Sequence, residues 1–241
     1  MSRLGDCVEI TSGFPFPSAQ FSSSGGGQFL VRGDNIGHGH LRKGEGRSFW
    51  WEGEIDERFA LSENDVLVAM DRPWISSGLK FAVVREDFLP ALLVQRVARL
   101  RAGSGIEQRF LAYVVRDQRF AEYLQSVQTG TGIPHVSAAQ IADYPVDMPD
   151  LATQTAIADV LGALDDKIAA NERVLASALA VARLHFAEAS REAQCEWLTY
   201  DDVVEVQGGG TPRTGTPEYW GGPIRWATPT DVTALTAPVL F

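Results

Sequence analysis

Residues 150–192, DLATQTAIADVLGALDDKIAANERVLASALAVARLHFAEASRE, decide the fold because they predict one long helix. The stretch contains no proline and a single glycine, Gly162. Apolar or small side chains recur in alternating steps of three and four residues, as in a helix whose stripe faces a second helix. We predict that the helix spans 150–193 and pairs through Ile157, Leu161, Leu164, Ile168, Asn171 and Leu175.

A helix of this length would extend on the order of 60 Å, at 1.5 Å per residue. A single domain of this size has no need of such an element, so we predict a coiled-coil-type rod that holds two objects apart. Asn171 favours that reading, because a polar residue in an apolar seam costs stability and fixes register and partner number. The alternative is an ordinary amphipathic helix packed on its own domain.

The composition limits the class of protein. The 241 residues are 45% hydrophobic, which is enough for one large domain or two ordinary ones. No apolar run reaches membrane-spanning length, and the first residues lack the apolar core of a signal peptide. Cys7 and Cys195 lie far apart and have no metal-ligand spacing. We predict a cytoplasmic protein with reduced thiols and no membrane partner.

The net charge of −10 restricts any role on nucleic acid. Neutralisation of phosphates dominates sequence-independent DNA binding, so a solitary DNA binder is normally basic. A DNA role here requires either a local basic face or a partner protein that supplies the phosphate contacts.

Residues 1–149 predict one mixed α+β domain. Strand-like apolar runs and one stretch of helical spacing follow each other along this part of the chain. The predicted strands are 29–32, 65–70, 80–84, 92–94 and 97–100, and the predicted helical stretch is 106–126.

A repeat appears beyond the long helix. Residues 202–209 match residues 6–13 at an offset of 196, and residues 229–232 match 33–36 at the same offset. Two weak matches in one register indicate an internal duplication. We therefore expect 194–241 to be the first part of a second, truncated domain.

This arrangement resembles the specificity subunit of type I restriction–modification systems. Both domain openings and the junction with its helix carry the resemblance, and the junction is the most specific part. The matching segments are Leu4–Gly13, Gly130–Ser137, Pro149–Leu151, Gly209–Thr214, Tyr219-Trp220, Ile224–Thr228 and Asp231, together with the helix residues Gln154, Ile157, Leu161, Leu164, Asp165, Ile168 and Asn171.

The resemblance implies two target recognition domains joined by antiparallel helices, each domain reading one half of a bipartite site in double-stranded DNA. It also implies that methyltransferase subunits dock on this protein and that restriction/translocase subunits complete the complex. A full family member has a complete second domain and a second long helix, so the chain is either a fragment or a half-subunit that self-associates through the helix.

Two groups of residues are candidates for DNA contact, since Arg and Asn offer forked donors to base edges and Lys more often meets phosphate. The first group is Arg32, Asn35, His38, His40, Arg42, Lys43 and Arg47. The second is Arg72, Trp74 and Lys80, with Thr131 and His135 in a glycine-rich loop. The alternatives are a solvated charged face for the first group, a turn residue at Asn35, a core cap at Trp74, and a plain connection at 129–135.

Catalytic chemistry is missing from the sequence. We find no glycine fingerprint, no Walker motif, no amino-methylation tetrapeptide, no metal-ligand spacing and no catalytic triad. We predict a non-catalytic subunit without cofactor or metal. It recognises the target site and sets the spacing for catalytic subunits on other chains. Two alternatives remain: a helical scaffold that never touches DNA, and the detached recognition portion of a fused restriction–methylation enzyme.

Overall fold

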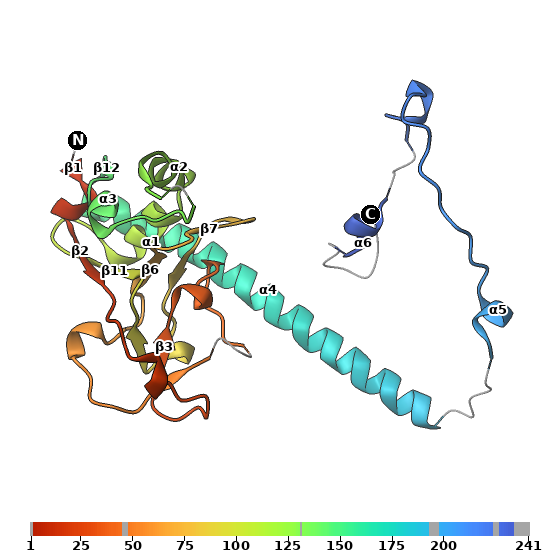
Figure 1. The fold of residues 1–241 in the computed structure, drawn as a ribbon, viewed down its shortest axis with the longest axis horizontal. Coiled ribbons are helices and arrows are strands. Elements are labelled where there is room, and N and C mark those ends of the chain that lie inside the picture. The colour runs from red at the N-terminus through yellow and green to blue at the C-terminus, as the bar shows by residue number, and fades with distance from the viewer. Residues whose placement is uncertain (1, 45–47, 131, 193–197, 224–226, 234–241) are drawn as a thin grey trace. The chain divides into compact units, whose positions relative to one another are not determined.

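The structure is a computed structural model that describes residues 2–44, 48–130, 132–192, 198–223 and 227–233. The chain divides into two compact units, Met1–Ala178 and Leu179–Phe241. The first unit combines sheets with helices (Figure 1), which confirms the predicted α+β class.

A five-stranded sheet forms the centre of the first unit. Its order is β2-β11-β6-β9-β4, and all neighbours are antiparallel except β4 and β9. The strands are β2 (Val8–Ser12), β11 (Val97–Ala102), β6 (Val66–Ala69), β9 (Phe81–Val83) and β4 (His38–Gly39). β6 is buried on both faces, which explains why it reads as an unbroken apolar run.

The alternation of side chains along β6 builds two cores. Val66 and Val68 belong to a core shared with the helices, whereas Leu67 and Ala69 belong to a core shared with a second sheet. The second sheet has the order β10-β3-β5, with β10 (Ala91–Leu93) parallel to β3 (Gln28–Val31) and β5 (Trp50–Trp51) antiparallel to it. Successive residues of a strand point to opposite faces, so one strand supports both cores.

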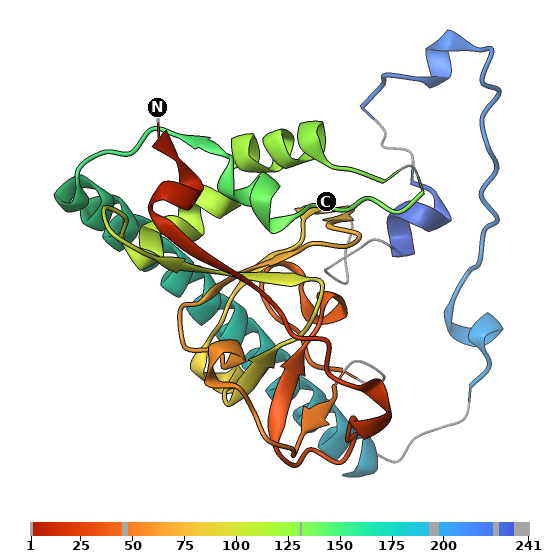
Figure 2. The same ribbon diagram turned by 60° about the vertical axis from the view of Figure 1, so that its left-hand side comes forward.

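Short elements complete the unit. β7 (Trp74–Ile75) and β8 (Gly78–Leu79) form a hairpin, and β1 (Ser2–Arg3) pairs with β12 (Pro145–Val146). The helices α1 (Gln108–Arg116), α2 (Gln118–Val127) and α3 (Ala138–Ala142) gather at one end of the domain, and the β10-β3-β5 sheet lies at the other (Figure 2).

The predicted helical stretch 106–126 is two helices. Asp117 has extended backbone angles, and its carboxylate accepts a hydrogen bond from the Arg119 backbone N–H at 2.8 Å. Aspartate is a preferred N-cap, and here the cap ends one helix and starts the next. The apolar spacing continues across the break, so periodicity alone did not reveal it.

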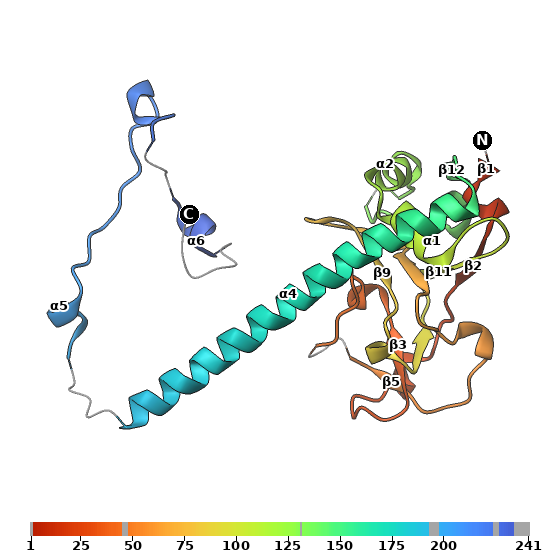
Figure 3. The same cartoon turned by 180° about the vertical axis from the view of Figure 1, so that it is seen from behind.

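The predicted long helix is present as α4 (Leu151–Glu192), 42 residues without interruption (Figure 3). Asp150 starts it by accepting hydrogen bonds from the Thr153 backbone N–H at 3.0 Å and hydroxyl at 2.9 Å. At 1.5 Å per residue the helix is about 60 Å long. No helix of the described segments is long and apolar enough to cross a membrane.

The segment after α4 contains α5 (Tyr200–Val203), a 3-10 turn at Pro217–Tyr219, and α6 (Pro229–Thr233). Within 198–223 and 227–233 no residue is buried and no strand forms. One local feature, a repeated cap, lies in the register of the predicted duplication. In the first pair, the backbone N–H groups of Arg3 and Thr199 each donate to the aspartate three residues later, at 2.8 and 2.7 Å. In the second pair, the N–H of Arg32 donates to Asn35 at 2.9 Å and the N–H of Thr228 donates to Asp231 at 2.7 Å. Both pairs of caps are 196 residues apart, as in the sequence match.

Candidate nucleic-acid interface

A hollow of about 600 Å³ on the first unit collects positive charge, and we call it the basic groove. Four cationic side chains line it: Arg32, Arg72, Lys80 and Arg96. The carboxylates of Asp34 and Asp71 lie in the same lining. Three of the four cations were predicted as DNA-contacting residues from separate parts of the sequence, and the fold brings them together.

Arg32 reaches the groove from the end of β3. Its guanidinium lies 3.3 Å from the Asp34 carboxylate and 5.1 Å from the centre of the Phe49 ring. A cation over an aromatic face is attracted by the ring quadrupole. Arg32 is therefore held at the groove with 31% of its side chain exposed.

Lys80 lies between β8 and β9 and is buried. Burial lowers the pKa of its ammonium group, the positive charges of Arg42 and Arg72 lower it further, and Asp34 opposes them. An anionic ligand in the groove would favour the charged form of Lys80, because an opposite charge nearby raises the pKa of a lysine.

Arg72 and Arg96 lie in turns where the backbone is left-handed, with φ angles of 45° and 69°. The backbone N–H of Arg72 donates to the Pro134 carbonyl at 3.0 Å, and the Arg96 carbonyl accepts from the Met70 N–H at 2.9 Å. Bulky side chains seldom adopt positive φ, because Cβ crowds the backbone. Both arginines are thus held in a costly conformation at the groove.

His135 is half-buried and contacts the same carboxylate that faces Arg96. Its Nδ1 is 2.5 Å from Oδ1 of Asp71, and Oδ2 of the same carboxylate is 3.4 Å from Nε of Arg96. Two backbone hydrogen bonds with Thr129, at 2.9 and 2.8 Å, close the loop on which His135 lies. The predicted Thr131 falls outside the described residues.

Several predicted contact residues have internal roles. Asn35 is fully buried; its Oδ1 accepts from the Arg32 N–H and its Nδ2 donates to the Arg42 carbonyl at 3.2 Å. An amide committed to the backbone in this way is not available to a base, so we do not retain Asn35 as a base reader. Half-buried Trp74 donates its indole N–H to Oε1 of Gln128 at 2.6 Å and packs on the core. This is the arrangement that the alternative of a core cap predicted for Trp74.

The predicted basic group 32–47 does not form one face. Of its described members only Arg32 lines the basic groove, because the chain turns at 33–35 and then adds β4 to the edge of the central sheet. His38 and His40 line another hollow, of about 930 Å³, beside α1 and α4. The remaining members differ: Arg42 is half-buried, Lys43 donates to the Asp87 carbonyl at 2.8 Å, and Arg47 lies outside the described residues.

Sequence reasoning missed Arg96 and Asp71. Arg96 follows Gln95 in the tight turn between β10 and β11, and Asp71 lies two residues after the end of β6. A single arginine in a short turn between apolar strands carries little signal by itself. The signal that could have found both residues is their position at the ends of neighbouring buried strands.

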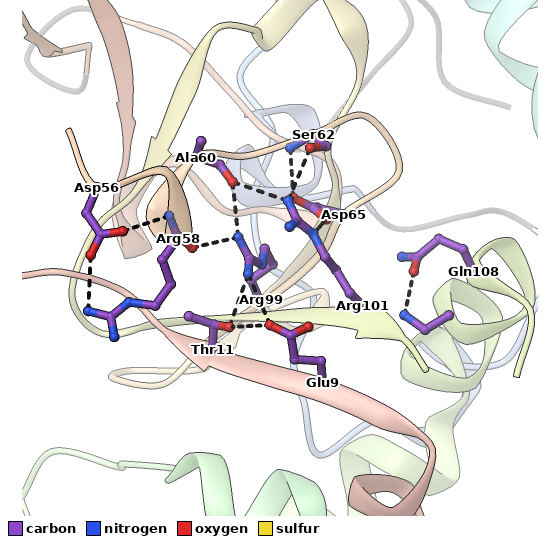
Figure 4. A network of polar contacts seen from close by, with 11 residues as sticks. Glu9, Thr11, Asp56, Arg58, Ala60, Ser62, Asp65, Arg99, Arg101 and Gln108 are labelled. Atoms are coloured by element: carbon purple, nitrogen blue, oxygen red, sulfur yellow. Dashed lines mark hydrogen bonds and ion pairs between the residues drawn. The ribbon is translucent and has the colours of Figure 1, made fainter. Parts of the chain in front are cut away.

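A second polar network, inside the domain, is structural (Figure 4). Arg99 is 2% exposed and donates to the carbonyls of Arg58 and Ala60 at 2.9 and 3.0 Å. Burial first, then the neighbouring Arg101, lowers the pKa of Arg99, while a hydrogen bond to Asp65 raises the pKa of Arg101. These side chains secure residues 58–65 to the central sheet.

The predicted pairing positions on α4 change from half-buried to exposed along the helix. Ile157 and Leu161 are half-buried; Asn171 and the apolar side chains Leu164, Ile168 and Leu175 are exposed. A different side of the helix is fixed to α1. Asp165 accepts from the Tyr113 hydroxyl at 3.0 Å and from Arg116 at 2.9 Å. The seam thus remains open to a partner beyond its first two positions.

A family model described as the type I restriction modification DNA specificity domain matches residues 1–179. The specificity subunit of the type I restriction enzyme EcoAI from Escherichia coli is 32% identical over 151 residues, 58% of this chain and 23% of that protein. The MjaVIII specificity subunit of Methanocaldococcus jannaschii is 28% identical over 169 residues, 69% of this chain and 39% of that protein. The chain thus spans less than half the length of these relatives.

Two solved structures share the fold. One, described as the basis of complex assembly and conformational transition of the type I R-M system, superposes with a TM-score of 0.53 at 19% identity, covering 77% of this chain and 43% of the other. The S subunit of a type I restriction–modification system from M. genitalium gives 0.51 at 15% identity, covering 79% and 44%. The expected resemblance is confirmed, because the family model and the relatives named are specificity domains and specificity subunits of type I restriction systems.

Proposed function

Because the chain belongs to the type I restriction modification DNA specificity family, we propose that residues 1–149 form a target recognition domain that reads one half of a bipartite DNA site. The observation that carries this proposal is the basic groove, where Arg32, Arg72, Lys80 and Arg96 converge in a chain of net charge −10. Cations focused in a hollow attract phosphate locally even when the bulk of the protein is acidic.

Because the rest of the chain is acidic, we propose that partner proteins supply the other phosphate contacts. We propose that methyltransferase subunits dock on this chain and clamp the duplex, and that restriction/translocase subunits join them. Bulk affinity and sequence recognition then lie on different polypeptides.

We propose that residues 150–193, which include α4, form the spacer between two readers, and that 194–241 begin the second recognition domain. The exposed stripe of Leu164, Ile168 and Leu175 supports pairing of α4 with a second helix, including self-association with another copy. Asn171, exposed in the same stripe, would fix the register of that pair.

Reversing one groove charge tests DNA binding at this site. We expect Arg72→Glu to weaken binding to a pool of duplexes by at least about tenfold at about 50 mM salt, because it places a carboxylate in the groove that repels phosphate in a duplex of any sequence. Arg85→Glu is the matched control, because Arg85 is exposed and does not line the basic groove. Equal affinity of Arg72→Glu and wild type in fluorescence anisotropy would remove the groove from the DNA interface.

Sedimentation tests the helix pairing. We expect Leu164→Asp with Ile168→Asp to abolish self-association, because each places a carboxylate in an apolar seam, while the first domain keeps its circular dichroism signal. Ser177→Asp with Ala180→Asp is the control, as both positions are exposed and lie off the seam. A wild-type chain that sediments as a monomer at tens of micromolar would contradict self-association.

A further inference from the structure

We propose that Arg72 and Arg96 read guanine bases in the target half-site, that Asp71 is a positioning residue which holds Arg96 for this task, and that Lys80 contacts phosphate. This inference rests on the proposed function, because it divides labour within the same basic groove. It assigns specificity to two residues and affinity to a third.

The backbone of the two arginines is the first argument. Both have positive φ, 45° at Arg72 and 69° at Arg96, where glycine or asparagine would be accommodated with less strain. Strained backbone persists where the surrounding structure enforces it, and such positions cluster at ligand-binding sites. The groove therefore contains two bulky, charged residues at positions where the backbone conformation alone would favour glycine.

The availability of donors is the second argument. Arg72 is exposed, and among the described residues its guanidinium has no hydrogen-bond or carboxylate partner. Arg96 has 61% of its side chain exposed and faces Asp71 through Nε, and neither terminal nitrogen has a hydrogen-bond partner in the described part of the chain. A guanidinium with free forked donors matches O6 and N7 of guanine in the major groove.

The Asp71 carboxylate is the third argument. Its two oxygens are divided between His135, at 2.5 Å, and Arg96, at 3.4 Å, so it ties the 129–135 loop to the turn that carries Arg96. A carboxylate at this place repels an approaching phosphate and favours a neutral base edge beside Arg96. Lys80 has no carboxylate within ion-pair distance among the described residues and presents a compact charge, which suits phosphate.

Selection from a random library tests this division. The full chain is incubated with duplexes that carry a randomised central segment, and bound sequences are recovered for wild type and variants. Arg72→Gly and Arg96→Gly remove the side chain at positions where glycine adopts the backbone conformation readily, so these variants keep the fold. Arg85→Ala is the control, and thermal unfolding is measured for each variant.

We expect Arg72→Gly and Arg96→Gly each to lose preference for one guanine, by roughly 10- to 100-fold in discrimination, while affinity for unselected duplexes changes little. Asp71→Asn should weaken the preference assigned to Arg96 and leave that assigned to Arg72. Lys80→Gln should lower affinity for all duplexes alike and reduce the slope of log affinity against log salt by about one.

Different failures have different meanings. A uniform loss of affinity in both glycine variants, with a smaller salt slope and the selected motif unchanged, would show that the arginines contact phosphate and would overturn the inference while the groove remained the DNA site. An unchanged motif in Asp71→Asn would overturn the positioning role. Failure of the wild type to retain any duplex, or wild-type behaviour of every groove variant, would overturn the proposed function itself.

Discussion

Gln154 joins the long helix to the rest of the first unit, and its replacement by methionine gives a prediction whose size follows from the structure. The side chain is fully buried. Its Nε2 donates to the carbonyls of Gly105 and Pro149 at 3.0 and 2.9 Å, and its Oε1 accepts from the backbone N–H of Glu107 at 2.9 Å. Methionine has nearly the same volume and helix propensity as glutamine, so Gln154→Met removes the three hydrogen bonds and little else.

The expected cost is the sum of three ordinary hydrogen bonds. Each contributes about 1 kcal/mol net, for a total of about 3 kcal/mol, and a buried group left without a partner costs more than that average. Gly105 is exposed, so water can reach its carbonyl and recover part of the loss. We therefore expect Gln154→Met to lower the free energy of unfolding by about 2–3 kcal/mol, and Tm by about 5–10 °C for a chain of this size.

Thermal and urea unfolding, followed by circular dichroism, measure this change. Gln118→Met is the matched control, because Gln118 is exposed on α2 and its one hydrogen bond is to a neighbouring exposed side chain. The control should remain within about 0.5 kcal/mol of wild type. A loss below about 1 kcal/mol in Gln154→Met would mean that the junction does not depend on these hydrogen bonds.

Two further predictions concern the polar network and the α1–α4 contact. Asp65→Ala should cost about 2–3 kcal/mol in urea unfolding, because it leaves Arg101 beside Arg99 without the carboxylate that it bonds at 2.5 and 2.8 Å; a loss under about 1 kcal/mol would refute this. The pKa of Tyr113 is raised to about 12, by burial first and then by its hydrogen bond to Asp165. The folded state thus holds this proton more tightly than the unfolded chain, so the contribution is complete below about pH 10 and lost as pH rises toward 12. Tyr113→Phe should reduce the fall of Tm across that alkaline range, and an unchanged fall would contradict the assignment.

The long helix could be predicted from sequence because its determinants are local. Periodicity, the absence of helix breakers and the Asp150 cap all lie within the segment that they specify. The break at Asp117 is also local, but the apolar spacing on either side stays in phase. The helix breaks at Asp117 despite this spacing, because an aspartate with an extended backbone ends the hydrogen bonding of α1 and caps the start of α2.

The basic groove could be predicted only in pieces. Arg32, Arg72 and Lys80 come from separate turns and strands, and their convergence depends on the order of the strands. Arg96 was missed because its significance lies in a backbone angle and in Asp71, and the only sequence signal for either residue is its place near the end of a buried strand. The mistaken grouping of residues 32–47 has the same cause, because neighbours in sequence separate where the chain reverses.

The repeated caps show which part of the duplication is encoded locally. Thr199 and Thr228 reproduce the caps of Arg3 and Arg32, although no strand forms in the described residues after α4. A cap needs only four residues, whereas β2 obtains its hydrogen bonds from β11, far away in sequence. Residues 199–202 and 228–231 thus carry the same turn signals as residues 3–6 and 32–35, independently of any sheet.

Acidic charge outside the groove has a consequence for specificity. A chain of net charge −10 is repelled by duplex DNA at most orientations, so under the proposed function productive contact would be confined to the groove and to surfaces supplied by partners. Specificity is a difference between affinities. It increases when non-specific binding is weakened, just as it increases when binding to the correct site is strengthened. With few phosphate contacts of its own, the isolated chain should show a shallow dependence of affinity on salt. The proposed division of recognition and affinity between chains is thus supported by charge as well as by the positions of the four groove cations.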